Sequence, residues 1–314
     1  MNLFITTFES VIVLIGIGVL GFYIIRKKIV PENALGILSP LALDIALPSL
    51  IFVSILANFN PSESQDWWLL PLWWLVFTGI VAMLTFLFMF VSKKETRREF
   101  AISLFFQNGI FFPLAILAGM FGNVSPYLVS LFLFTLFYPA LFFNTYHLFF
   151  RKKLNKLSWK RILNPVLVAT LIALLIRLLG FQNYVPGFII SILGMLGAMA
   201  LPIIMLIIGG NIYIDFHNKG TFYFPEVAKF VIIKNILFPL IFLLILVVIR
   251  PAYYIALLLL LQSAVPPVTS VSIFTQRAGG NHSIVNQFVV ASFISSLISL
   301  PLMILLFSMI YIAP

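Results

Sequence analysis

Hydrophobic residues fill long, nearly uninterrupted segments of this chain, and short polar connections separate them. Each segment has about the twenty residues that an α-helix needs to cross a bilayer. The pattern therefore predicts an all-α chain with ten membrane spans and no soluble domain. In chain order the predicted spans are Phe4–Ile25, Leu35–Ala57, Trp67–Val91, Phe100–Met120, Ser125–Phe150, Ile162–Gly180, Pro186–Asn211, Pro225–Ile249, Pro251–Thr275 and Asn286–Ile312.

The ninth span is interrupted in its middle by two polar residues, Gln262 and Ser263, and by the consecutive prolines Pro266 and Pro267. Proline has no backbone N–H and its ring clashes with the preceding turn, so two in a row should break the helix. Hydrocarbon does not tolerate free backbone groups that face lipid, so the break must be buried in protein or line a cavity. We therefore expect it to be part of a functional site.

The fourth span is interrupted in the same way, by Gln107, Asn108, Gly109 and Pro113. Interrupted spans in corresponding positions of two halves point to the binding site of a transporter. Where two such breaks cross, two half-helix N-termini bring their partial positive ends together and can hold a carboxylate. The side chains of both breaks then either add hydrogen bonds to a substrate or only cap the broken helix ends.

A weak repeat divides the chain into residues 1–155 and 156–314, with five predicted spans in each half. Ala46-Leu47-Pro48 recurs as Ala200-Leu201-Pro202 at an offset of 154, and Gln107 recurs as Gln262 at an offset of 155. An odd number of spans makes the second half enter the membrane in the opposite sense, so the repeat is predicted to be inverted.

Composition places the chain in a membrane, since 62% of its residues are hydrophobic, 9% are charged and the mean hydropathy is +1.15. The net charge of +10 reflects topology and not nucleic-acid binding, because 15 of the 19 Lys and Arg residues lie in alternate connections. By the positive-inside rule those connections face the cytoplasm, so both termini of a protein of the cytoplasmic membrane lie outside. The chain has no cysteine, which excludes disulfides and thiolate metal sites.

Two charged residues lie deepest in the predicted spans, Asp44 and Lys234. Each is nine residues from the cytoplasmic start of its span, roughly 13 Å deep at 1.5 Å per residue. A charge at that depth costs free energy, so each should face a cavity or a partner. They either pair with each other, or Lys234 attracts an anionic substrate and Asp44 carries the coupling ion, H⁺ or Na⁺.

The segment Ser263–Leu302 resembles the auxin efflux carrier family, whose bacterial members include malate and malonate permeases. The resemblance rests on an Ala-x-Pro break, a helix of small residues, a short glycine-containing turn and a closing span. Further agreement lies in Leu193–Asn211, in KNILFP from Lys234 to Pro239, and in the run from Leu47 to Phe52. The fourth span departs from the family pattern Asn-x-Gly-x-x-Gly-x-Pro: anchored on Pro113, it has Phe106 at the asparagine and Phe111 at the second glycine. Either the break is remodelled here or the substrate differs.

The resemblance implies an inverted-repeat fold like that of sodium/proton antiporters, with the fourth and ninth spans crossing at their breaks. It implies a scaffold of spans one, two, six and seven, a mobile bundle of spans three to five and eight to ten, and homodimers formed through the scaffold. We therefore expect a secondary transporter or facilitator of small organic anions, without enzymatic activity, cofactor or bound metal. A cation/proton exchanger that uses Asp44 and a membrane sensor without transport are the alternatives.

Overall fold

The computed structural model describes residues 3–62, 66–122, 125–150, 163–217 and 222–312, and in these segments the regular structure is helical apart from one isolated β-bridge. Within these described segments, seven helices are long and apolar enough to cross a membrane. Three shorter apolar helices, Phe111–Phe121, Pro165–Leu178 and Tyr253–Ala264, coincide with parts of the predicted fourth, sixth and ninth spans, the first of them extending one residue beyond its span. The predicted all-α membrane fold is thus confirmed, while the count of ten spans and the inverted repeat stay predictions.

The first half of the chain contains α1 (Leu3–Arg26), α2 (Ala34–Pro40), η1 (Leu41–Ala46), α3 (Leu47–Asn58), α4 (Leu69–Phe88), η2 (Met89–Val91), α5 (Arg97–Phe105), α6 (Phe111–Phe121), α7 (Pro126–Phe134), α8 (Tyr138–Thr145) and η3 (Tyr146–Phe150). The second half contains α10 (Pro165–Leu178), η4 (Phe181–Tyr184), α11 (Gly187–Ala198), α12 (Ala200–His217), α13 (Phe224–Val231), η5 (Ile232–Leu237), α14 (Phe238–Ile249), α15 (Tyr253–Ala264), α16 (Ser270–Arg277) and α17 (His282–Ile310).

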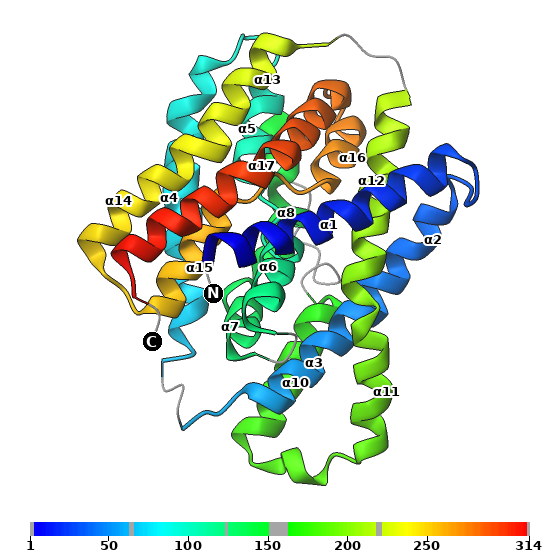
Figure 1. The fold of residues 1–314 in the computed structure, drawn as a ribbon, viewed down its shortest axis with the longest axis vertical. Helices are drawn as coiled ribbons and strands as arrows, with labels where there is room; N and C mark the ends of the chain where they lie inside the picture. Colours follow the sequence, from blue (N-terminus) through cyan, green and yellow to red (C-terminus); the bar gives the residue numbers. More distant parts are fainter. Residues whose placement is uncertain (1–2, 63–65, 123–124, 151–162, 218–221, 313–314) are drawn as a thin grey trace.

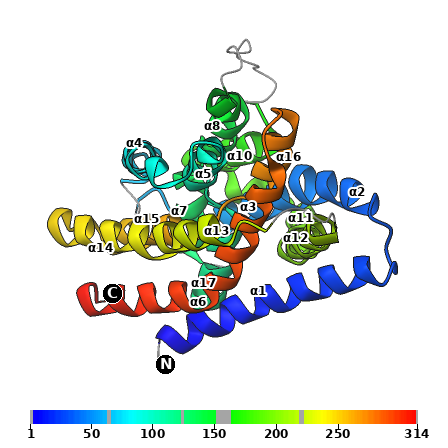
Figure 2. The same cartoon turned by 90° about the horizontal axis from the view of Figure 1, so that it is seen from above.

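The first group of helices is built on the packing of α1 along α12 and of α3 against α10 and α11. In Figures 1 and 2, α2, α11 and α12 lie on one side of the molecule and α1 reaches across to them. Glycines allow α1 and α12 to touch backbone to backbone, because a Cβ at Gly21 or at Gly209 would collide with the main chain of Leu206 or of Gly18. These contacts join elements of the predicted scaffold.

The second group contains α4, which packs against α5, α7 and α15, and α17, which packs against α5, α13, α15 and α16. A buried carboxylate holds one edge of this group together. Glu226, on α13, is 1% exposed and accepts hydrogen bonds from the Ser92 hydroxyl at 2.8 Å and from the Lys229 ammonium at 2.8 Å. These contacts join elements of the predicted bundle, whose movement against the scaffold stays a prediction.

Two of the long helices contain a turn of π-helix, and in each case a proline follows. The π segment η1 ends two residues before Pro48, and η5 ends two residues before Pro239. Because proline has no N–H, it cannot bond to the carbonyl four residues earlier, and the widened turn accommodates that loss. The carbonyls that lose this hydrogen bond belong to Asp44 and Asn235. Each π segment therefore includes a polar residue.

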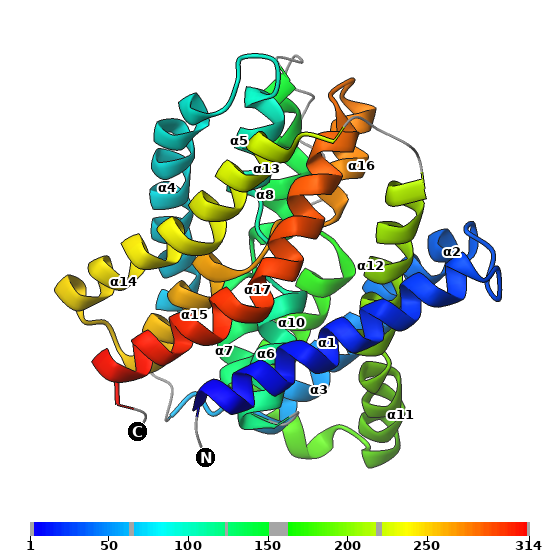
Figure 3. The same ribbon diagram turned by 45° about the horizontal axis from the view of Figure 1, so that its top comes forward.

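The ends of the helices gather at two ends of the molecule (Figure 3). The start of α1, the end of α17, the end of α3 and the connection from α10 to α11 lie at one end, and the connections from α4 to α5 and from α16 to α17 lie at the other. The predicted junction between the two halves, with the basic stretch from Arg151 to Arg161, lies outside the described residues, as does Lys219. Which end faces the cytoplasm stays a prediction.

Candidate functional site

The fourth and ninth spans are both interrupted where their sequences predict it. The helix α5 ends at Phe105 and α6 begins at Phe111, while α15 ends at Ala264 and α16 begins at Ser270. Val265 is extended, with ψ at 151°, because the ring of the following proline disfavours the helical conformation. Pro113 lies in the first turn of α6 and not in the break, at a place where its missing N–H breaks no helical hydrogen bond.

The two breaks pair with each other as short antiparallel strands. The Asn108 N–H donates to the Pro266 carbonyl at 2.7 Å, and the Val268 N–H donates to the Phe106 carbonyl at 3.0 Å, on either side of the bridge between Gln107 and Pro267. Backbone groups that the broken helices leave free are thereby satisfied inside the protein, as a membrane interior requires. The breaks therefore cross in contact.

Side chains reinforce this crossing. The Gln262 side-chain amide donates to the Gly109 carbonyl at 2.6 Å, and the Gln107 amide donates to the Gln262 side-chain oxygen at 3.4 Å. Tyr138, from α8, donates its hydroxyl hydrogen to the Gln107 carbonyl. A Cβ at position 109 would lie 2.6 Å from the Gln262 side-chain oxygen, so any side chain there would displace Gln262. Gln262 thus caps a backbone carbonyl of the other break, and the part of these side chains in substrate binding stays a prediction.

The crossing also contains Asn108, whose side-chain oxygen has no hydrogen-bond partner among the described residues. Its Oδ1 is buried and accepts no hydrogen bond from the described residues, although its backbone N–H takes part in the bridge. Phe106, which stands where the family pattern has an asparagine, turns its ring into an apolar cluster with Phe142 and Phe149. The fourth span therefore supplies one amide oxygen at Asn108 without a described partner and an aromatic packing residue at position 106.

Lys234 reaches the crossing from the π segment η5. Its ammonium donates to the Ser263 carbonyl at 3.1 Å, at the C-terminal end of α15 where helix carbonyls are unpaired, and it lies 5.4 Å from the ring centroid of Phe238. The side chain is 1% exposed. Among the described residues, the only ion pair joins Lys229 to Glu226, so Lys234 has no carboxylate beside it. The site therefore contains one buried lysine amine without a described carboxylate beside it.

The structure does not pair Asp44 with Lys234. Asp44 is exposed on η1 and lines none of the cavities described below, contrary to the prediction of a buried charge that faces a cavity or a partner. The reason is the orientation of its helix: Ala42 and Ala46 are buried, and the three residues between them are exposed. Asp44 lies on that exposed face.

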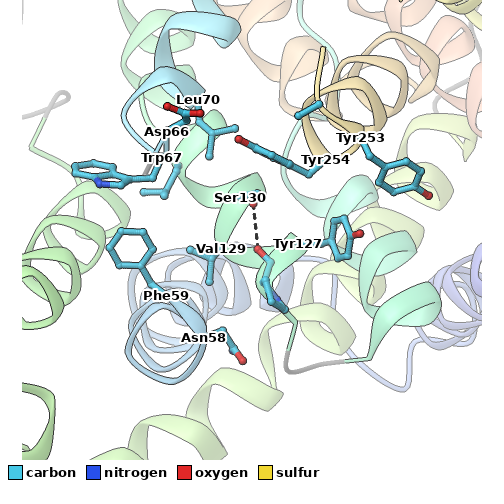
Figure 4. Close-up of a pocket in the computed structure, with 13 residues that line it drawn as sticks. Asn58, Phe59, Asp66, Trp67, Leu70, Tyr127, Val129, Ser130, Tyr253 and Tyr254 are labelled. Carbon is cyan, nitrogen blue, oxygen red and sulfur yellow. Dashed lines mark hydrogen bonds between the residues drawn. The ribbon is translucent and has the colours of Figure 1, made fainter. Parts of the chain in front are cut away.

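A cavity of about 630 Å³ lies between the end of α3 and the helices α4, α7 and α15 (Figure 4). Aromatic residues form much of its wall, and the hydroxyl end of Tyr254 points toward Asp66. A second cavity, of about 250 Å³, lies between α3 and α11 on one side and α6 and α7 on the other, and shares Asn58 with the first. Both therefore open between the two groups of helices.

None of the crossing residues lines these two cavities. Gln107, Asn108, Gln262 and Ser263 are each at most 3% exposed, so the crossing is closed in this structure. A substrate that enters either cavity would reach the breaks only after the helix groups rearrange.

Sequence reasoning missed Tyr138, Asn235 and Ser292. Asn235 binds the Ser292 carbonyl at 3.0 Å and accepts the Ser292 hydroxyl at 2.6 Å, which fixes η5 to α17 beside Lys234. The sequence could have indicated Asn235, because it lies next to Lys234 and four residues before Pro239. A proline at that position cannot donate a backbone hydrogen bond to the Asn235 carbonyl. Within the described parts of the chain, no group of three His, Asp or Glu residues could hold a metal ion.

Comparison with known proteins places this architecture among transporters. A family described as "Membrane transport protein" matches residues 6–151 and 144–304, which together span nearly the whole chain. The "Uncharacterized transporter MJ1031" of Methanocaldococcus jannaschii is 25% identical over 207 residues, which cover 64% of this chain and 67% of that protein. The resemblance to the auxin efflux carrier family is thereby confirmed.

Proposed function

The chain belongs to the membrane transport protein family, and from this premise we propose that it carries small organic anions, carboxylates in particular, across the cytoplasmic membrane. Transport occurs by alternating access at the crossing of the two broken helices. The prediction that the protein is not an enzyme agrees with membership of a transporter family. The choice of an anion as substrate rests on the charges and hydrogen-bond donors of the crossing.

The observation that carries the proposal is the meeting of two positive helix ends. The N-termini of α6 and α16 begin directly after the paired breaks. The N–H groups of Phe111 and Phe112, and those of Thr269 and Ser270, donate no hydrogen bond to another described residue. Such free N–H groups at helix N-termini favour negative charge, and a carboxylate satisfies them without a charged side chain.

Lys234 adds a full positive charge to these partial ones. A buried ammonium whose described partners are a carbonyl and an aromatic ring is costly inside a membrane, and an anion that arrives at the crossing would offset part of that cost. In the proposal, Lys234 holds the end of α15 in the empty protein and draws the substrate anion toward the crossing.

The cavities support a route between the two groups of helices. The larger two are lined both by α3 or α11 and by helices of the other group, so a movement of one group against the other would extend them to the crossing. An inward gradient of H⁺ or Na⁺ supplies the driving force. In this scheme Asp44 is the candidate carrier of the coupling ion.

Uptake of labelled mono- and dicarboxylates into proteoliposomes, with and without an inward proton or sodium gradient, tests the proposal. We expect saturable uptake of at least one carboxylate, absent from protein-free liposomes. Loss of the gradient dependence in Asp44→Asn would assign the coupling role to that residue. Folded protein that moves no carboxylate under any gradient would contradict the proposal and favour a sensor or a cation exchanger.

A further inference from the structure

A third cavity, of about 50 Å³, lies between α12, α16 and α17, and half of the residues that line it are polar. Thr269 and Ser272 of the α16 N-terminus line it, together with Asn211 from α12 and Asn286 from α17. A site of this size holds a carboxylate group or a few water molecules but not a larger ligand. It lies next to the ninth-span break, because Thr269 is the second residue after Pro267.

Two polar side chains of this cavity are more than nine-tenths buried. Asn286 is 7% exposed and Ser272 is 6% exposed, and neither side chain forms a hydrogen bond with another described residue. A buried amide or hydroxyl without a partner costs free energy, so such groups are retained where a water molecule or a ligand satisfies them. Both side chains border the cavity, so a water molecule or a ligand in the cavity would be their hydrogen-bond partner.

The donors around the cavity favour an anion. The first turn of α16 contributes the free N–H groups of Thr269 and Ser270, and the partial positive end of the helix. The Asn286 amide and the Ser272 hydroxyl can each donate a further hydrogen bond. The lining residues include no acidic side chain, which a site for a metal cation or an ammonium group would need to balance the charge.

From these observations we infer that the carboxylate group of the transported anion binds in this cavity, held by Asn286, Ser272 and the N-terminus of α16. Asn211 closes the site from the α12 side, so that the bound anion touches both groups of helices. The inference rests on the proposed function and assigns residues to it.

The matched pair Asn286→Asp and Asn144→Asp tests the inference. Both place a carboxylate in the bundle, but Asn144 lies on α8, bonds to the Ala140 carbonyl and lines none of the cavities. The experiment measures proteoliposome uptake of a carboxylate that the unmodified protein transports, and thermal unfolding of each variant in detergent. Two alanine variants, Asn286→Ala and Ser272→Ala, accompany the pair. Ser296→Ala is the control for Ser272→Ala, because Ser296 already donates to the Phe293 carbonyl of its own helix, α17.

We expect Asn286→Asp to raise the KM for the carboxylate about tenfold or more by charge repulsion, and Asn286→Ala and Ser272→Ala to raise it several-fold. Asn144→Asp and Ser296→Ala should leave KM unchanged. Unchanged KM in folded Asn286→Asp would overturn the inference but not the proposed function. Tighter binding in Asn286→Asp would also overturn it and indicate a cation site. If the unmodified protein transports no carboxylate, the proposed function fails first.

Discussion

Gln107 and Gln262 lie 155 residues apart in the chain, yet the amide of one donates to the side-chain oxygen of the other at 3.4 Å. These are the residues whose equal positions in the two halves suggested an internal repeat. Their contact lies at the crossing, where Gln262 also holds the Gly109 carbonyl at 2.6 Å. The crossing is therefore fixed by groups that the sequence places in corresponding breaks.

The two glutamines should contribute unequally to stability. Gln262→Leu leaves the buried Gly109 carbonyl without its donor, so we expect a loss of about 1–3 kcal/mol in unfolding free energy. Gln107→Leu removes a long hydrogen bond and leaves its backbone bridge intact, so it should cost less. Thermal unfolding of both variants in detergent measures the difference, and equal destabilisation would contradict the roles assigned here.

Gly109→Ala should disturb the crossing through Gln262. The added Cβ would lie 2.6 Å from the Gln262 side-chain oxygen, so that side chain must move and its hydrogen bond to the Gly109 carbonyl weakens. We expect slower transport and a lower unfolding temperature. In the double variant with Gln262→Ala the two changes should not add, because the collision is gone. Strictly additive effects would show that the alanine acts elsewhere.

The absence of cysteine makes accessibility measurements straightforward. Ser54 lines the cavity of about 250 Å³, and Asn211 lines the cavity of about 50 Å³. If the predicted topology is correct, Ser54→Cys should react with a membrane-impermeant thiol reagent from outside, and a transported carboxylate should slow the reaction. Asn211→Cys should react from the cytoplasmic side. The reverse pattern of sidedness would contradict the predicted orientation.

Asp44→Asn examines the candidate coupling residue. Asp44 is exposed, and its π segment η1 packs against helices of the predicted scaffold, so its removal should leave the KM for the carboxylate unchanged. If Asp44 carries the coupling ion, the variant should lose the stimulation by an ion gradient and keep passive exchange of the substrate. Comparison of gradient-driven uptake with exchange separates the two effects. An increased KM would instead place Asp44 in substrate binding.

Much of the fold could be predicted because the strongest signals are local. The prolines at 266 and 267 cannot continue α15, and the Gln107-Asn108-Gly109 sequence marks the other break. The membrane spans follow from length and hydropathy alone. Pro113 was assigned to the break but lies within α6, because proline is tolerated in the first turn of a helix.

The remaining features depend on which face of each helix is buried, and the sequence carries little information on this. Lipid and protein interior are both apolar, so a span has no clear amphipathic pattern. The orientation of Asp44 toward the exposed face could not be read for that reason. The contribution of Tyr138 could not be predicted either, because Tyr138 reaches the Gln107 carbonyl from α8, which belongs to a different predicted span. The pairing of the two breaks as strands is likewise a long-range contact.

The central claim is that an anion is transported at the crossing beside Lys234. The most direct measurement compares carboxylate uptake by proteoliposomes containing unmodified protein, Lys234→Met or Lys93→Met. Methionine keeps most of the side-chain volume. Lys93 is exposed, and its ammonium forms no hydrogen bond or ion pair with a described residue. We expect uptake to fall about tenfold or more in folded Lys234→Met and to be unchanged in Lys93→Met. Uptake by Lys234→Met at the unmodified rate and KM would contradict the account.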